Sequence, residues 1–113
     1  MKHIIAYIKP HKLPSVTLAL HRIKNLTGMT RLNVDGCGRG MYIGEDHSTE
    51  QELCDYIPHI KLEIFCLDKL SEEVVSTIQK KAHTGLKGDG KIYISNVEDA
   101  IRISSDERGE KAV

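Results

Sequence analysis

The sequence has 113 residues, of which 40% are hydrophobic and 28% are charged, a balance typical of one globular domain rather than two. The 16 basic and 16 acidic side chains cancel, which argues against a general nucleic-acid-binding protein. No apolar run approaches the roughly 20 residues of a membrane span, and the N-terminal residues lack a secretion signal. We therefore expect a single cytoplasmic domain over residues 1–113, without membrane insertion.

The first third of the chain predicts a strand, a helix and a second strand. Residues 2–9 carry apolar β-formers on both faces and end before Pro10, which indicates a covered strand. Four apolar residues then recur at helical spacing: Leu13, Val16, Leu20 and Ile23. Asn25 and Gly28 lie where this helix should end. Residues 30–39 alternate apolar and polar side chains and form the second predicted strand.

Residues 40–58 show no sustained period and predict a long loop, a kind of segment that often carries function. The next strand is clear, with Ile60, Leu62, Ile64 and Cys66 on one face and Lys61, Glu63 and Phe65 on the other. A helix over 71–81 follows, capped by Ser71. A strand at 92–94 and a short last strand at 101–103 complete the pattern.

This order, βαββαβ with a short C-terminal strand, predicts an α+β ferredoxin-like sandwich. Two amphipathic helices would cover one face of the sheet. The other face also carries apolar side chains: Ile5, Tyr7, Phe65 and Tyr93. We expect self-association to cover this second face.

Residues 84–91 read TGLKGDGK and allow two interpretations. Successive glycine-rich N–H groups can cradle an anion, with Lys87 and Lys91 adding positive charge. Alternatively, Gly85 caps the preceding helix and an Asp-Gly turn leads into the next strand, and the spacing alone favours this. The segment is not a Walker P-loop, because the glycine–lysine spacing differs and no Ser or Thr follows the lysine.

Two further basic elements are candidates for anion binding. The stretch GCGRG at 36–40 places Arg39 among glycines, where a ligand could approach the backbone and a guanidinium could grip phosphate. Arg102 stands on the short last strand. The simpler interpretation of GCGRG is a flexible strand end, and that of Arg102 is a solvated charge on an edge strand.

Five motifs occur in one order across essentially the whole chain: IIAYIKPHKL, TGMT, GCGRG, TGLKGDGKIYI, and VEDAIRI followed by GE. In this order and spacing they resemble the PII signal-transduction family. The resemblance implies a non-enzymatic protein of nitrogen regulation, built as a homotrimer of ferredoxin-like subunits. It further implies that ATP and ADP compete in intersubunit clefts, and that the T-loop, residues 40–58, regulates a transporter or enzyme.

The resemblance also implies which residues bind the nucleotide. Phosphates would be held by the glycine-rich segment, the adenine by Thr30, Glu63 and Phe65, and Arg102 would reach in from the neighbouring subunit. The full expected set is Thr30, Gly38, Arg39, Glu63, Phe65, Lys87, Gly88, Asp89, Gly90, Lys91 and Arg102. No cofactor is obligatory; ATP, ADP and AMP are the expected ligands, and Mg²⁺ could accompany ATP.

Several positions depart from the family pattern. Gly40 replaces a glutamine and His59 a lysine that contact 2-oxoglutarate, so we expect this effector not to bind. Ser104 replaces an arginine that contacts phosphate, so ADP or AMP should compete better with ATP. Glu52 replaces the uridylylated tyrosine and Glu50 a phosphorylated serine, so covalent switching in the usual manner is not expected.

Two alternatives remain open. Cys37, His47, Cys54 and His59 are weak metal-ligand candidates without a fixed spacing, and an alternative function is a PII-like sensor of a metal or small anion, in metal efflux or bicarbonate handling, with nucleotide secondary. An enzyme would need a nucleophile–base pair, and none is evident. Asp89 and Glu63 could activate water, but a turn aspartate and a strand glutamate are simpler interpretations.

Overall fold

The computed structural model describes residues 1–38 and 56–113, so predictions made for Arg39, Gly40, His47, Glu50, Glu52 and Cys54 lie outside the described residues. Its helices are α1 (Leu13–His21) and α3 (Asp68–Ala82), and short 3₁₀ turns occupy Pro10–Lys12 and Gly109–Ala112. The strands are β1 (Lys2–Ile8), β2 (Thr30–Gly36), β3 (Ile57–Cys66) and β4 (Ile92–Asn96). They form one antiparallel sheet in the order β2-β3-β1-β4. The predicted ferredoxin-like arrangement is thereby confirmed.

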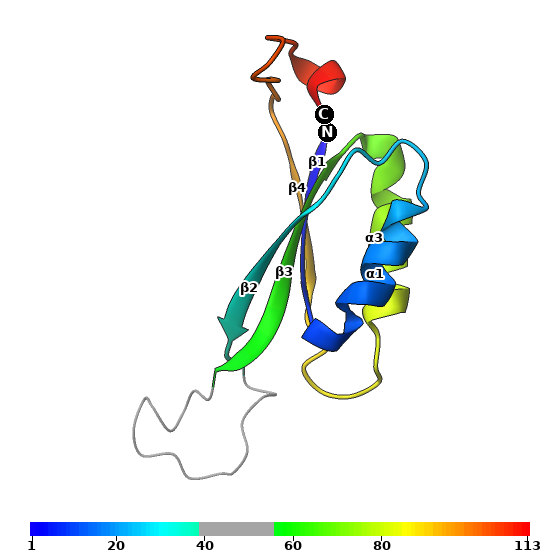
Figure 1. Cartoon of the computed structure of the whole chain (residues 1–113), viewed down its shortest axis with the longest axis vertical. Coiled ribbons are helices and arrows are strands. Elements are labelled where there is room, and N and C mark those ends of the chain that lie inside the picture. The colour runs from blue at the N-terminus through cyan, green and yellow to red at the C-terminus, as the bar shows by residue number, and fades with distance from the viewer. Residues whose placement is uncertain (39–55) are drawn as a thin grey trace.

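The core lies between the sheet and the two helices, which pack side by side on one face (Figure 1). Strand residues point into it at every second position and helix residues at three- or four-residue steps, as the apolar spacing predicted. These side chains are almost fully buried: Ile4, Ala6, Ile8, Val16, Leu20, Ile60, Leu62, Ile64, Cys66, Leu70, Val74, Ile78 and Ala82.

The start of α3 differs from the prediction. The helix begins at Asp68, with Leu67 at the N-cap and no side-chain cap, so Ser71 is inside the helix rather than its cap. The Asp68 carboxylate instead accepts a hydrogen bond from the N-terminal ammonium at 2.8 Å, and this contact lowers the pKa of Asp68. A negative charge at the first turn also complements the helix dipole.

The bounds of β2 and β3 also differ from the prediction. β2 ends at Gly36 rather than at residue 39, and β3 begins at Ile57, so Ile57 and Pro58 belong to a strand rather than to the predicted 40–58 loop. Pro58 lies opposite Asp35 in the ladder. A proline is tolerated there because it stands near the start of its strand.

The predicted last strand is reduced to one bridge in the described part of the chain, between Ile101 and Arg108. The segment turns back on itself through Asp106, which has a φ of 61°, and the Arg102 N–H donates to the Glu107 carbonyl. Ile103, one of the two alternating isoleucines that predicted a strand, is 98% exposed and so does not pack on the sheet.

The sheet face opposite the helices carries apolar side chains, as expected. Tyr7 and Tyr93 meet edge to face with ring centroids 6.3 Å apart. Phe65 and Tyr93 are 47% and 53% exposed in the single chain. We refer to Ile5, Tyr7, Phe65 and Tyr93 as the open face. No helix within the described ranges is long and apolar enough to cross a membrane.

The burial pattern predicts the stability of core variants. Ile64→Ala should lower the free energy of unfolding by about 2–5 kcal/mol, because it empties a fully buried position. Leu18→Ala, on a side chain that is 54% exposed, should change it by no more than about 0.5 kcal/mol. Urea denaturation of both variants measures the difference, and equal losses would contradict the assigned faces.

Candidate functional site

The glycine loop, which we define as residues 84–91, connects α3 to β4. α3 ends at Ala82, and His83 at its C-cap has extended backbone angles, so Gly85 is not the helix cap that the simpler interpretation proposed. Gly85, Gly88 and Gly90 have φ values of 81°, 81° and 103°. Residues other than glycine rarely adopt these angles. The loop therefore turns repeatedly, which is the kind of backbone that an anion cradle requires.

The end of the loop lies directly on β1. A Cβ atom at Gly90 would lie 1.7 Å from the Tyr7 carbonyl oxygen, so no side chain fits there. The Tyr7 N–H donates to the Lys91 carbonyl at 3.0 Å. Glycine is therefore required at position 90 both for its backbone angle and for its lack of volume.

Asp89 organises the loop from inside. Its carboxylate accepts hydrogen bonds from the Thr84 N–H at 2.8 Å, the Gly85 N–H at 3.2 Å and the Thr84 hydroxyl, and pairs with the Lys9 ammonium at 3.2 Å. The hydrogen bond from the Thr84 hydroxyl is the largest cause that holds the pKa of Asp89 well below its usual range, and the hydrogen bond from the Thr84 N–H is the next largest. That Asp89 belongs to the nucleotide site stays a prediction; its carboxylate oxygens are engaged within the loop, which makes it a poor base for activating water.

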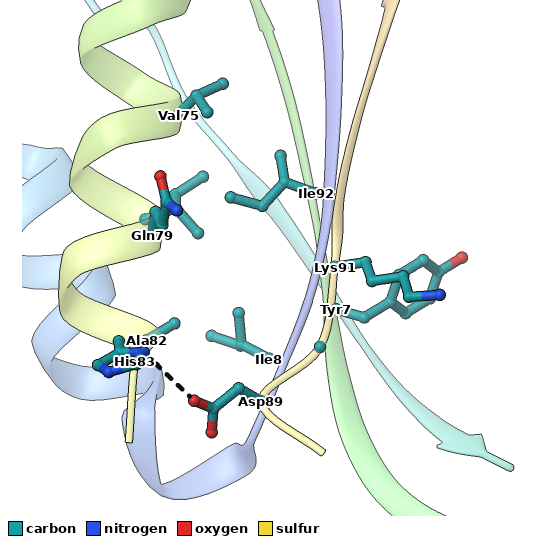
Figure 2. Close-up of a pocket in the computed structure, with 11 residues that line it drawn as sticks. Tyr7, Ile8, Val75, Gln79, Ala82, His83, Asp89, Lys91 and Ile92 are labelled. Atoms are coloured by element: carbon teal, nitrogen blue, oxygen red, sulfur yellow. Dashed lines mark ion pairs between the residues drawn. The ribbon is translucent and has the colours of Figure 1, made fainter. Parts of the chain in front are cut away.

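The lysines of the loop are differently placed. Figure 2 shows Lys91 on the same side of the sheet as Tyr7, whereas Asp89 points toward His83 on the α3 side, at 3.6 Å. Lys87 and Lys91 are both exposed. Their ammonium groups have no hydrogen-bond or ion-pair partner in the part of the chain that the structure describes. The loop therefore presents positive charge that its own carboxylate does not neutralise.

His59 joins β3 to the glycine loop. It is only 5% exposed, and its Nε2 lies 3.0 Å from the Gly88 carbonyl oxygen while Nδ1 lies 3.1 Å from that of Ile57. The sequence indicated only a lost lysine and a weak metal ligand at this position, because a contact across 29 residues leaves no local pattern. Both ring nitrogens lie against carbonyl oxygens, so a metal would have to displace one of these contacts. Residues 1–38 and 56–113 contain no cluster of three potential metal ligands.

Thr30, Glu63 and Phe65 lie together at the other end of the sheet. Thr30 pairs with Glu63 across β2 and β3, and all three line a cavity of about 580 Å³. We call it the second cavity, to distinguish it from the glycine loop at the opposite end of the sheet. His3 stacks under Phe65 with ring centroids 4.4 Å apart and places Nε2 3.2 Å from the Glu63 carboxylate. The prediction did not include His3, since its role depends on its register opposite Phe65.

Arg102 follows Ile101, which lines this second cavity. Its guanidinium is about half exposed, lies 3.8 Å from the Glu107 carboxylate and donates to the Lys111 carbonyl at 3.3 Å. The side chain is thus held near the second cavity by contacts of its own segment, and no hydrogen bond or ion pair within residues 1–38 and 56–113 links it to the glycine loop.

The predicted residues therefore fall into two half-sites. The first is the glycine loop, beside Tyr7 at one end of β1; the second surrounds Phe65, opposite His3 near the other end. Four residue-to-residue steps along the strand, roughly 13 Å, separate Tyr7 from His3. Figure 1 shows the 83–91 segment and the chain termini at opposite ends of the sheet. One chain does not bring the two half-sites together.

Comparison with known proteins identifies the family. The family model "Nitrogen regulatory protein P-II" matches residues 1–107. The chain is similar to a nitrogen regulatory protein P-II of Azospirillum brasilense (39% identical) and one of Rhodospirillum rubrum (42%), each over the full length of both chains. It is 43% identical to nitrogen regulatory protein P-II 2 of Methanothermobacter thermautotrophicus, over the whole chain and 97% of that relative.

The family match covers both half-sites and the fold that carries them. Identities near 40% over the full length leave no part of the described fold outside the similarity. The chain belongs to the nitrogen regulatory protein P-II family, a family of signal-transduction regulators that are not enzymes.

Proposed function

We propose that this protein is a trimeric, cytoplasmic sensor of adenine nucleotides that regulates a transporter or enzyme through residues 40–58. The separation of the two half-sites within one chain carries this proposal. A ligand with a polyanion at one end and an aromatic base at the other would bridge the glycine loop of one subunit and the second cavity of its neighbour.

The phosphate end is supported by the glycine loop. Its backbone turns at three glycines, and the charges of Lys87 and Lys91 have no partner among residues 1–38 and 56–113. Hydrogen bonds between such donors and phosphate oxygens are charge-assisted and therefore strong. Gly38 and Arg39 of the implied set would add to this end.

The base end is supported by Phe65. Its ring is half exposed and is backed by the stacked His3, so a planar adenine could lie on its outer side. The Glu63 carboxylate could accept hydrogen bonds from the exocyclic amine, and Thr30 stands opposite it in the sheet. These groups suit adenine, which offers a donor where guanine offers an acceptor.

Assembly is supported by the open face. A sheet face with half-exposed aromatic side chains favours burial against other copies of the chain. A closed ring of identical subunits would bring each glycine loop to a neighbour's second cavity, and Arg102 would approach the phosphates from there.

The ligand preference follows from the charges. Ser104 supplies no positive charge where the family resemblance implies an arginine. This loss should weaken the binding of the ligand with the most phosphate charge, so ADP or AMP would compete better with ATP. The oxygens of Asp89 are already engaged, so Mg²⁺ brought by ATP would be held by the phosphates rather than by this carboxylate. No observation favours the alternative sensor of a metal or small anion.

Lys91→Ala should weaken ADP binding at least about tenfold, because a charge-assisted contact is typically worth about 1.5–3 kcal/mol. Isothermal titration calorimetry measures the loss. Lys69→Ala, which removes an exposed lysine at the start of α3, is the matched control and should bind like the wild type. Equal affinities of the two variants would remove Lys91 from the phosphate site.

Tyr93→Asp should dissociate the assembly, since it places a charge on the open face. Leu18→Asp changes a side chain of nearly equal exposure on α1, 54% against 53%, and should leave the assembly intact. Analytical ultracentrifugation separates the species. A trimer that persists in Tyr93→Asp at low concentration would argue against the open face as the interface.

Addition of 2-oxoglutarate with Mg-ATP should produce no heat beyond that of Mg-ATP alone. Gly40 has no side chain to offer, and both nitrogens of His59 are already engaged. Calorimetry with and without the effector tests this, and clear synergy would show that these two positions do not decide the response.

A further inference from the structure

The Glu63 carboxylate is held by one of its two oxygens. His3 Nε2 lies 3.2 Å from Oε1, and the Lys61 ammonium lies 3.7 Å from the same atom, beyond hydrogen-bond distance. No hydrogen bond within residues 1–38 and 56–113 reaches Oε2. Glu63 is partly buried and lines the second cavity. Oε2 is therefore the oxygen that remains for a ligand.

The contact requires a proton on Nε2 of His3. An ionised carboxylate only accepts hydrogen bonds, so the histidine is the donor. The neutral tautomer with its proton on Nε2 supplies this donor, and so does the imidazolium. The contact therefore does not depend on whether His3 is charged.

The register of the sheet fixes where His3 stands. It lies opposite Phe65 in the β1–β3 ladder, and Ile5 lies opposite Glu63, so His3 is a diagonal neighbour of Glu63 on the same face. Its ring stacks on Phe65 with centroids 4.4 Å apart and 11° between the planes. His3 is not among the residues that line the second cavity, so its action on a ligand passes through Glu63 and Phe65.

The number of free oxygens decides which purine a carboxylate holds best. The Watson–Crick edge of adenine offers one donor group, the exocyclic amine, beside an acceptor nitrogen. The same edge of guanine offers two adjacent donors, the ring N–H and the exocyclic amine. A free carboxylate can bind such a pair with both oxygens at once, as it binds the fork of an arginine. A carboxylate with one oxygen engaged keeps its contact with adenine and loses part of its contact with guanine.

We propose that His3 is a positioning residue that selects adenine over guanine in the second cavity. By engaging Oε1 it fixes the Glu63 carboxylate and leaves Oε2 as a single acceptor for the adenine amine. Without His3, both oxygens would be free to turn toward the two donors of guanine. The inference rests on the proposed function for the nucleotide itself, and it adds the residue that decides which base is bound.

Binding of ADP and GDP to two variants of His3 tests the selection by isothermal titration calorimetry. His3→Phe keeps a ring that can stack on Phe65 but has no donor, and His3→Gln keeps a donor but has no ring. Wild type should prefer ADP to GDP by at least about tenfold, the range expected for one charge-assisted hydrogen bond. This preference should fall about tenfold in His3→Phe and stay within about threefold of wild type in His3→Gln.

His21→Phe makes the same substitution at an exposed histidine of α1 and is the matched control, with the preference of the wild type. An unchanged preference in His3→Phe overturns the proposal. An equal fall in His3→Phe and His3→Gln also overturns it, because the selection would then come from the stacked ring rather than from the hydrogen bond.

Nitrogen-15 NMR of the ligand-free protein tests the contact without any nucleotide. At about pH 7 the Nε2 of His3 should carry a proton, as either donor form requires. Its resonance should shift in Glu63→Gln and stay unchanged in Glu72→Gln, which alters an exposed acid of α3. A bare Nε2 with the proton on Nδ1 overturns the proposal.

The outcomes separate this inference from the proposed function. Binding of ADP with no effect of His3 on the preference overturns the role of His3 and leaves the proposed function standing. Absence of nucleotide binding in wild type and all variants overturns the proposed function and the selection with it, while the spectra still show whether His3 holds Glu63. If His3→Phe does not fold, His3→Leu, which also lacks a donor, replaces it with the same expected preference.

Discussion

The candidate site depends on the contact between the glycine loop and the end of β1. At Gly90 the backbone of the loop lies against the backbone of Tyr7, where no side chain could fit. A hydrogen bond from the Tyr7 N–H to the Lys91 carbonyl joins the same two segments. β1 is a central strand that pairs with both β3 and β4. The end of the loop is therefore fixed to the middle of the sheet.

The inside of the loop is filled by its own acid. Asp89 faces Thr84, Gly85 and Lys9, whereas Lys87 and Lys91 are exposed to solvent. The negative charge that would repel a phosphate is thereby turned inward and neutralised. An aspartate is therefore compatible with the proposed anion binding of this loop, since it shapes the loop and its carboxylate is turned away from the proposed ligand.

The fold could be predicted from periodicity because its core follows simple repeats. Leu62 and Ile64 alternate with polar side chains, and Val74 and Ile78 recur at helical spacing, so each pattern identifies the buried face. The start of α3 could not be predicted, because its first acid meets the N-terminal amino group, 67 residues away. The prediction of a last strand was wrong because this segment pairs with itself, at the Ile101–Arg108 bridge, rather than with the sheet.

The site was predicted only in part, for a related reason. Its residue types carried the resemblance to the family, but its geometry depends on contacts that no spacing encodes. His59 meets Gly88 across 29 positions, and His3 meets Phe65 across the β1–β3 ladder. Neither histidine belongs to a motif, so only the register of the sheet reveals them.

The placement of the half-sites at opposite ends of one sheet has a consequence for mixed assemblies. On the proposed arrangement each site belongs to a pair of neighbours and not to a chain. A subunit with a defective loop and a subunit with a defective second cavity would each be silent alone, yet would form an intact site where their sound halves meet. A nucleotide bound between two subunits would also stabilise the assembly, so both dilution of the protein and depletion of the ligand would favour dissociation.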